Sequence, residues 1–230
     1  MPLPADGQIR VMLVDAHRIV LSGLQRLVDD ERPDLAVVAT ASDRASALEQ
    51  AHSAKPDVVV LDVRLTENGD ADVIPTLING RNTRVLILSE DREGNRHEAA
   101  ILQGACGVVR KDDAPETLIK AIKKVHEGQL WLDRSTTGRL FVELSRRKGN
   151  GSSDPSQKKI ATLTVREHDV VRTLVTYPGV DNKTLATNLH IGEHTLRNHL
   201  SRIYDKLGVP NRVQLFVFAE RHGFSARQRA

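Results

Sequence analysis

The last quarter of the chain carries the apolar spacing of several short helices, and this pattern restricts the fold more than any other feature of the sequence. In the segment from about 193 to 207, apolar residues recur at intervals of 4, 3 and 4 positions, and they are Leu196, Leu200, Ile203 and Leu207. This spacing places them along one face of a helix, while polar residues and cations occupy the other side. Such a helix packs on a small core and exposes its polar face.

Capping signals set the limits of the helices in this region. Thr164 with Glu167 three residues later forms a capping box, which predicts a helix that starts at Val165. Asp181 is a favourable N-cap for a second helix, and Gly208 ends the third. The sequence therefore predicts four helices, over about 165–176, 182–189, 193–207 and 211–221.

A tight turn at His190–Glu193 separates the second and third predicted helices. Two short helices joined in this way, the second with a polar outer face, are typical of a helix-turn-helix unit that binds double-stranded DNA. Arg pairs with guanine edges or phosphates, Asn pairs with adenine, and Ser and Thr bond to either. The outer face and flanks of the third helix carry His194, Thr195, Arg197, Asn198, Ser201, Arg202 and Asp205. On this pattern alone, a helical bundle with a solvated outer face is an equal alternative.

Charge is divided unevenly along the chain. From Pro155 onward there are twelve Lys and Arg against six Asp and Glu, a net charge of +6, whereas residues 1–154 carry 21 against 24, a net charge of −3. A basic module joined to an acidic one favours phosphate binding in the C-terminal part only.

The first 127 residues alternate short apolar runs with amphipathic segments. The apolar runs cover 9–14, 35–39, 57–61, 84–88 and 107–109, and the helical patterns cover about 18–30, 43–54, 71–80, 92–103 and 114–127. Runs of Val, Leu and Ile suit parallel strands covered on both faces. The alternation predicts an α/β doubly wound five-stranded parallel sheet. Gly104–Gly107 has the wrong spacing for a dinucleotide or P-loop fingerprint, so a Rossmann-type dehydrogenase is not expected.

Polar residues follow the predicted strands at their carboxyl ends, where open α/β sheets bind ligands. They are Asp15 after the first strand, Asp62 after the third, Ser89 after the fourth and Lys111 after the fifth. A carboxylate can attack a phosphoryl donor to form an acyl phosphate, and Mg²⁺ prefers such oxygen ligands. Lys111 would pair with the phosphoryl group and Ser89 would donate to it. Each residue alone is an ordinary strand-end residue, but the four together favour a phosphorylation site.

Several spaced motifs of the C-terminal region resemble the LuxR-type helix-turn-helix domain, and they are Leu163–Glu167, Asn182–Ala186, Ile191–Leu200 and Lys206–Gly208. The resemblance implies a small all-α, four-helix domain whose third helix lies in the major groove and whose fourth often forms a dimer contact. It implies that Arg197, Asn198 and Ser201 contact bases or phosphates, and that Lys183 and Thr195 contact the DNA backbone. Relatives often have an apolar residue and a Lys in place of Asn198 and Ser201, so the operator sequence does not follow.

The N-terminal region resembles a flavodoxin-like receiver domain through Leu13–His17, Val60–Arg64, Leu88–Ser89 and Lys111–Asp112. With the C-terminal motifs, the whole chain resembles the two-component response regulators of the NarL/FixJ family. The resemblance implies the following roles: Asp62 as phospho-acceptor, Asp15 as acidic-pocket member, Ser89 as switch hydroxyl, Lys111 as phosphate-binding lysine, and the carbonyl of Arg64 as a further Mg²⁺ ligand.

Four residues depart from the usual pattern of that family. Ala16 replaces a second acid that normally touches the metal, so Mg²⁺ is expected to bind weakly. Thr66 replaces a usual Pro, and Glu90 adds negative charge near an incoming phosphoryl group. Val108 replaces the switch aromatic, whose ring rotation reports phosphorylation. Together these changes favour an atypical receiver with weak phosphorylation or none as the alternative.

We expect a receiver domain over 1–130, a linker over 131–159 and a DNA-binding domain over 160–230. The linker is expected to contain a helix over 133–147 and then a polar, Gly- and Ser-rich flexible tether over 146–159. Trp131, the only Trp in the chain, is expected to anchor the end of the receiver.

Composition restricts the compartment and the partners. The single cysteine, Cys106, suits a reducing cytosol and is assigned to packing. No apolar run is long enough to span a membrane and no secretory signal precedes Ile9, so a cytoplasmic protein is expected. An aromatic content of 3% argues against stacking on single-stranded nucleic acid. His17 and His199 are assigned to packing or hydrogen bonding rather than to a metal.

The expected function is a DNA-binding transcriptional response regulator and not an enzyme. A sensor histidine kinase or a small phosphodonor would phosphorylate Asp62, and a homodimer would occupy two DNA half-sites. The first alternative is an orphan regulator, independent of phosphorylation, whose degenerate receiver is a dimerisation or docking module. The parallel sheet argues against a quorum-type small-molecule sensor. The DNA module and the lack of a second orienting acid argue against a phosphatase-like enzyme.

Overall fold

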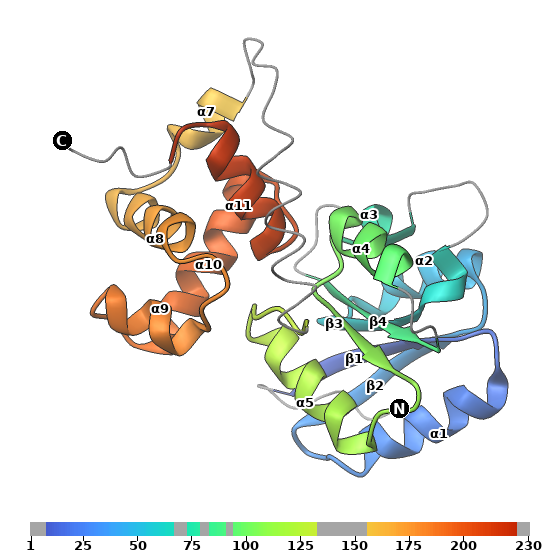
Figure 1. Cartoon of the computed structure of the whole chain (residues 1–230). Coiled ribbons are helices and arrows are strands. Elements are labelled where there is room, and N and C mark those ends of the chain that lie inside the picture. The colour runs from blue at the N-terminus through green and yellow to red at the C-terminus, as the bar shows by residue number, and fades with distance from the viewer. Residues whose placement is uncertain (1–7, 67–72, 79–82, 91–93, 133–155, 225–230) are drawn as a thin grey trace. The chain divides into compact units, whose positions relative to one another are not determined.

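The structure is a computed structural model that describes residues 8–66, 73–78, 83–90, 94–132 and 156–224 of the 230-residue chain. The chain divides into two compact units, Met1–Trp131 and Leu132–Ala230, and each is described by itself. Figure 1 labels the helices and strands of both units.

The N-terminal unit is built on one parallel sheet of five strands in the order β2-β1-β3-β4-β5 (Figure 1). The strands are β1 (Ile9–Val14), β2 (Leu35–Ala41), β3 (Val58–Asp62), β4 (Arg84–Ser89) and β5 (Gly107–Arg110). Their apolar residues are buried because helices cover both faces of the sheet. The predicted doubly wound five-stranded parallel sheet is therefore confirmed.

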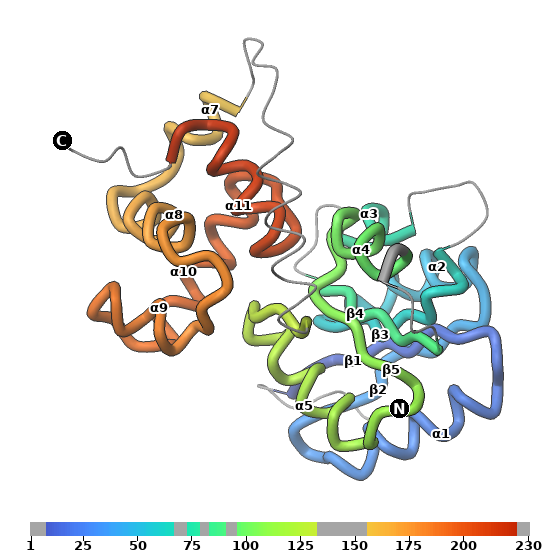
Figure 2. Tube along the Cα trace, in the orientation of Figure 1, coloured from blue at the N-terminus to red at the C-terminus, as the bar shows by residue number. Residues whose placement is uncertain are grey.

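Two layers of helices enclose this sheet. They are α1 (Arg18–Asp29), α2 (Arg44–Ala54), α3 (Val73–Ile78), α4 (Gly94–Gln103) and α5 (Pro115–His126), with a short 3₁₀ helix, η1 (Val63–Thr66), after β3. In Figures 1 and 2, α1 and α5 cover one face and α2, α3 and α4 cover the other. Apolar side chains of α1 and α5 share one core cluster with residues of the sheet.

The strand order fixes where a ligand can bind. Because β2 lies on one side of β1 and β3 on the other, the order reverses between β1 and β3. In doubly wound sheets the ligand crevice lies at this reversal, outside the carboxyl ends of the strands. Asp15 follows β1 directly and Asp62 is the last residue of β3, so both carboxylates belong to this crevice.

The C-terminal unit is helical, as predicted. Its helices are α7 (Ser156–Ile160), α8 (Val165–Thr176), α9 (Asn182–Asn188), α10 (Glu193–Leu207) and α11 (Arg212–Arg221). The capping box of Thr164 and Glu167 is present at α8, and Asp181 caps α9 by accepting from the Thr184 amide. Gly208 ends α10 in the left-handed conformation with φ 70°. The four apolar residues of the α10 stripe are buried in the core of this unit.

Two local predictions from the sequence are wrong. The flexible tether was expected to run to residue 159, but α7 forms there because Ile160 packs against the core and the Lys159 ammonium donates to the Leu207 carbonyl at 3.2 Å. From the sequence, Asp113 is the expected cap of the helix predicted over about 114–127, but its carboxylate accepts from the Arg110 amide and Ala114 is the N-cap of α5. The helix predicted over 133–147 lies outside the described residues.

Trp131 is half-buried and extends the sheet edge beyond β5. Its amide donates to the Cys106 carbonyl at 2.9 Å, and its carbonyl accepts from the Val108 amide at 3.0 Å. The indole packs against the core cluster that α1 and α5 share. Cys106 itself is buried, and burial raises the pKa of its thiol to about 11.

Replacing Gly107 by alanine is expected to destabilise the N-terminal unit by about 2 kcal/mol. An added Cβ would lie 2.6 Å from the Trp131 Cβ and 2.7 Å from the Trp131 carbonyl oxygen, so the backbone pairing would have to shift. Denaturant unfolding followed by Trp131 fluorescence measures the change. Gly23→Ala on α1 is the control, because its added Cβ meets no atom within 4 Å. Equal unfolding midpoints for the two variants would contradict the prediction.

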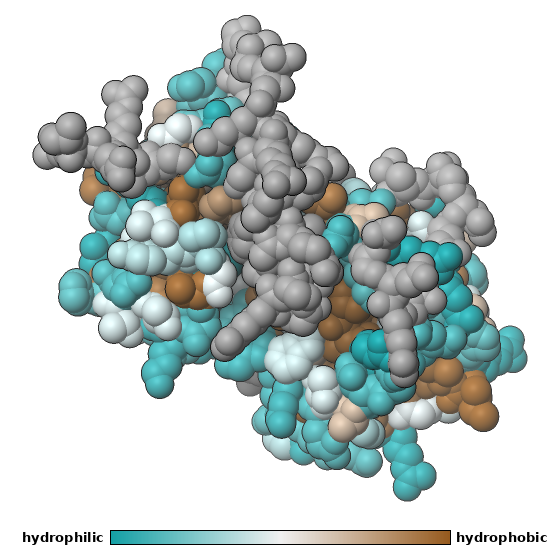
Figure 3. Space-filling model, in the orientation of Figure 1, coloured by the Kyte–Doolittle hydropathy of each residue, from teal (hydrophilic) through white to brown (hydrophobic). Residues whose placement is uncertain are grey.

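The visible surface is mainly hydrophilic, with small and separate hydrophobic patches (Figure 3). Among the described residues, the large apolar side chains that are exposed are Ile19, Val165 and Tyr177. Of the helices that the structure describes, none has the length and apolar character needed to cross a bilayer.

Candidate functional site

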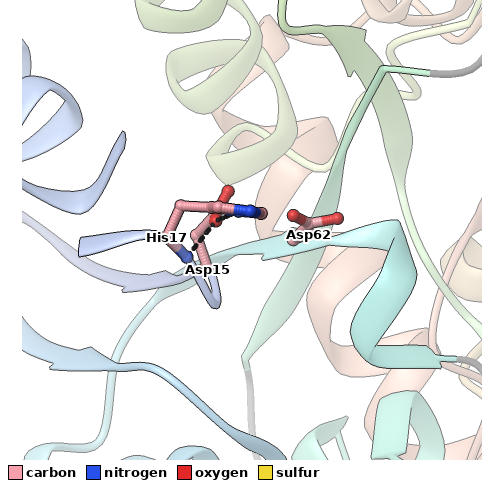
Figure 4. Close-up of side chains that lie close together, drawn as sticks. All are labelled: Asp15, His17 and Asp62. Carbon is pink, nitrogen blue, oxygen red and sulfur yellow. Dashed lines mark hydrogen bonds and ion pairs between the residues drawn. The ribbon is translucent and has the colours of Figure 1, made fainter. Parts of the chain in front are cut away.

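Two buried carboxylates face each other at the carboxyl ends of β1 and β3 (Figure 4). Asp15 lies on the loop after β1, where its Oδ1 accepts from the His17 amide at 2.8 Å and contacts His17 Nδ1 at 3.1 Å. Asp62 ends β3, and its Oδ1 accepts from the Arg64 amide at 2.9 Å. Main-chain donors two residues further along the chain therefore orient both side chains.

Lys111 joins the two carboxylates across the crevice. Its Nζ donates to Asp15 Oδ2 at 2.6 Å and to Asp62 Oδ2 at 2.8 Å. Burial lowers the pKa of Lys111, but these hydrogen bonds outweigh it and raise the pKa overall. Burial likewise raises the pKa of Asp62, but hydrogen bonds from Lys111 and Arg64 outweigh it and hold the pKa below its usual range. Asp62 and Lys111 are therefore an ion pair at neutral pH.

Arg64 contributes its side chain to the same pocket, which the sequence did not predict. Its Nη2 lies 3.2 Å from Asp62 Oδ2, 3.2 Å from Glu90 Oε1 and 3.1 Å from His17 Nδ1. The resemblance to the response regulators had implied a role only for the carbonyl of Arg64. The position of an Arg two residues after a buried carboxylate could have indicated this contact, because a tight turn such as η1 can direct the side chain back toward Asp62.

Ser89 ends β4 in a fully buried position. Its Oγ lies 2.8 Å from His97 Nε2 of α4, and its carbonyl accepts from the Lys111 amide at 2.8 Å. The sheet register pairs Asp62 with Leu88, the residue before Ser89. The structure therefore places the four residues predicted from strand ends, Asp15, Asp62, Ser89 and Lys111, at one edge of the sheet.

Glu90 was expected to add negative charge near the acceptor, but its carboxylate is paired with two cations. It lies 3.2 Å from Arg64 Nη2 and 3.3 Å from Lys111 Nζ. Among the residues that the structure describes, the pocket thus holds three carboxylates and two cations.

The donor set fits a Mg²⁺ ion that keeps most of its waters. Asp15, His17 and Asp62 each offer a ligand atom, and these atoms lie within 4.8 Å of one another. The carboxylate oxygens are the ligands that Mg²⁺ prefers, but Ala16 supplies none. All four oxygens of Asp15 and Asp62 also accept hydrogen bonds from the chain itself. The donor atoms of the site therefore suit Mg²⁺, but the ion would have to replace hydrogen bonds that these carboxylates already accept.

The helix predicted to face DNA has the expected arrangement. Along α10 and the start of α9, the side chains of Lys183, His194, Thr195, Asn198 and Arg202 are exposed, and those of Arg197 and Ser201 are half-buried. Leu196, Leu200 and Ile203 on the opposite side of α10 are buried, which fixes the rotation of the helix. Asn198 Nδ2 lies 3.4 Å from His194 Nδ1, one turn earlier on the same face.

Comparisons with known proteins agree with both units. The family model of the response regulator receiver domain matches residues 11–123, and that of the bacterial regulatory proteins, luxR family, matches residues 161–219. The chain is 31% identical over 220 residues to transcriptional regulatory protein LnrK of Bacillus subtilis (strain 168), which covers 94% of this chain and 99% of that protein. It is 34% identical over 212 residues to the DNA-binding transcriptional activator DevR/DosR of Mycobacterium tuberculosis, covering 92% and 94%.

A solved structure also matches the receiver. The LuxR-family two-component response regulator from Aurantimonas sp. SI85-9A1 has a TM-score of 0.51 and 31% sequence identity, over 59% of this chain and 97% of that one. A parallel sheet with this acidic edge, joined to a helix-turn-helix, defines a DNA-binding response regulator of the two-component type. The chain belongs to the NarL/FixJ family, whose matching members are transcriptional regulators rather than enzymes.

Proposed function

We propose that this regulator accepts a phosphoryl group on Asp62, from a sensor histidine kinase or a small phosphodonor, and controls promoter binding through dimerisation. The observation that carries the proposal is the ammonium of Lys111, which contacts the carboxylates of both Asp15 and Asp62 at the crevice. We assign residues 1–130 to the receiver, 131–159 to the linker and 160–230 to the DNA-binding domain, in a cytoplasmic protein.

In the transfer, a carboxylate oxygen of Asp62 forms a bond to phosphorus while the bond from phosphorus to the donor breaks, and the leaving group takes its electron pair. Lys111 is placed to pair with the phosphoryl oxygens, and the hydroxyl of Ser89 to donate to them. Asp15, Asp62 and the carbonyl of Arg64 would hold Mg²⁺, which neutralises charge on the transferring group when bound.

The output is double-stranded DNA binding by α10. We assign Arg197, Asn198 and Ser201 to bases or phosphates, Lys183 and Thr195 to the backbone, and His194 and Arg202 to the rim of the same surface. One helix-turn-helix makes few contacts, so a homodimer on two half-sites supplies useful affinity. Phosphorylation would favour the arrangement that pairs these domains.

Incubation with acetyl phosphate and Mg²⁺ tests the phosphorylation step. We expect intact-mass measurement to detect one added phosphoryl group, which hydroxylamine removes because it is an acyl phosphate. Asp62→Asn should abolish the gain, since an amide is not a nucleophile here. A persistent gain in that variant would move the acceptor elsewhere. No gain with any donor would refute phosphorylation at Asp62.

An orphan regulator is the second candidate, and specific residues favour it. Ala16 removes a metal ligand, Val108 removes the switch ring, and the Arg64 guanidinium already contacts Asp62. In this case the receiver dimerises or docks without chemistry. DNA footprinting of both forms at one stated salt concentration separates the candidates, because an orphan regulator gives the same footprint after incubation with a phosphodonor.

Replacing Ala16 by aspartate is expected to tighten Mg²⁺ binding by about tenfold, because it restores a carboxylate next to Asp15. Residue 16 is exposed, so the new side chain can be accommodated without disturbing the core. Calorimetric titration with MgCl₂ measures the affinity, and Ala16→Asn is the matched control without charge. A gain of the same size in both variants would show that the added charge is not the cause.

A further inference from the structure

The side chain of Arg64 places a second cation in the acidic pocket, and the phosphoryl transfer does not use it. We propose that this guanidinium competes with Mg²⁺ for Asp62, so that the ion enters only when Arg64 swings toward solvent. The proposal rests on the proposed function only in assuming that Mg²⁺ binds in this pocket.

The hydrogen bonds of Asp62 show the competition. Its Oδ2 accepts from both Arg64 Nη2 at 3.2 Å and Lys111 Nζ at 2.8 Å, and its Oδ1 accepts from the Arg64 amide at 2.9 Å. A metal ion bound by Asp62 needs one of these oxygens. Lys111 is also held by Asp15 and is only 13% exposed, so the Arg64 guanidinium is the donor that can leave most easily.

The charges of the pocket support the same exchange. Among the described acidic and cationic side chains of the pocket, the carboxylates of Asp15, Asp62 and Glu90 carry −3, and Lys111 and Arg64 carry +2, which leaves −1. A divalent ion added beside both cations would give +1, whereas the same ion in place of the guanidinium gives 0. Exchange of the guanidinium for the ion therefore avoids a third cation next to the carboxylate of Asp62, which Lys111 already contacts.

Arg64 can move outward without disturbing the core. Its side chain is 41% exposed, and its other partners, Glu90 and His17, are 55% and 51% exposed. Asp62 beneath it is 1% exposed. The Arg64 guanidinium therefore lies between the Asp62 carboxylate and solvent and pairs with its charge. Ala16 provides no additional carboxylate that could bind Mg²⁺ while the guanidinium stays in place.

Calorimetric titration of the full chain with MgCl₂ alone tests the proposal. Arg64→Gln removes the charge and is expected to bind Mg²⁺ about tenfold more tightly. Arg64→Lys keeps a cation and is expected to bind as weakly as the natural chain. Arg26→Gln is the charge-matched control. Arg26 lies in the last turn of α1, away from the pocket, because it is the first turn of α1 that follows His17.

Circular dichroism establishes that each variant is folded, and Arg64→Met is a second neutral variant should Arg64→Gln fail to fold. Equal Mg²⁺ affinities for the natural chain and the neutral variants would overturn the proposal, as would undetectable binding in both. A tenfold gain in Arg26→Gln would also overturn it, since net charge alone would then be the cause.

Failure of this proposal and failure of phosphorylation give different results. If the neutral variants bind Mg²⁺ more tightly but no chain gains a phosphoryl group, the competition stands and the acceptor role of Asp62 fails. If the natural chain is phosphorylated while Arg64→Gln shows no change in Mg²⁺ affinity, the acceptor role stands and the competition fails.

Discussion

Replacing Arg197 by alanine is expected to weaken operator binding by about 2 to 6 kcal/mol, which is roughly 30-fold to 10⁴-fold in affinity. A good base-edge or phosphate contact of an Arg contributes about 1 to 3 kcal/mol, and a dimer on two half-sites loses it twice. Arg197 lies in the first half of α10, between buried Leu196 and exposed Asn198. Because the apolar stripe of α10 fixes its rotation, the loss does not require any change in the fold.

A salt series separates the two roles that Arg197 can have. The DNA is a duplex obtained by selection on the natural chain. If Arg197 contacts a phosphate, its loss from both subunits makes the slope of log K against log salt less steep by about two. A base contact leaves the slope nearly unchanged and abolishes discrimination at one base pair. Arg172→Ala, an exposed cation on α8, is the charge-matched control. The assignment fails if both variants lose affinity to the same extent.

Strand and helix positions could be predicted from the sequence because their signals are local. β1 matches its predicted limits, and β2 continues two residues beyond them, to Ala41. Continuous apolar runs indicate strands that are buried on both faces. Asp181 and Gly208 indicate where helices begin and end, because caps act through contacts within a few residues. The edge location of the acidic residues followed from the rule for doubly wound sheets, which needs only the strand ends.

The individual side-chain contacts of the pocket and of the helical core could not be predicted. The side chain of Arg64 returns to Asp62 and reaches Glu90, but an arginine after a strand is more often solvated. The contact between Ser89 and His97 depends on how α4 packs beside β4. Likewise, α7 forms because Ile160 packs against the core of the helical unit and Lys159 donates to the Leu207 carbonyl. The polar sequence around these two residues does not indicate either contact.

Replacing Glu167 by alanine is expected to destabilise the helical unit by about 3 kcal/mol, a large part of the stability of a small domain. The carboxylate of Glu167 is buried, and its Oε2 accepts from the Thr164 amide at 2.7 Å and from Lys206 Nζ at 2.6 Å. One side chain therefore completes the capping box of α8 and ties α8 to α10. Alanine leaves the Thr164 amide without this acceptor and removes the ion pair of Lys206, whose ammonium keeps only its hydrogen bond to the Thr162 carbonyl.

The pH dependence of this contribution identifies its electrostatic part. Burial raises the pKa of Glu167, but hydrogen bonds from Lys206 and Thr164 outweigh it and hold the pKa below its ordinary value of 4.5. Since the folded-state pKa is the lower one, the stabilisation is complete above pH 4.5 and is lost as pH falls through the folded-state pKa. Glu167→Gln keeps an acceptor but not the charge, so its deficit relative to the natural chain should shrink in acid.

Urea unfolding of the full chain, followed by the near-ultraviolet circular dichroism of Tyr177 and Tyr204, which both belong to the helical unit, measures this loss. Asp205→Asn removes an exposed carboxylate from α10 and is expected to change stability by less than about 0.5 kcal/mol. A Glu167→Gln deficit that stays constant from neutral to acid pH would assign the effect to shape and hydrogen bonding alone. A deficit that closes below the ordinary pKa assigns it to the ion pair with Lys206, because only the charged carboxylate distinguishes the two chains.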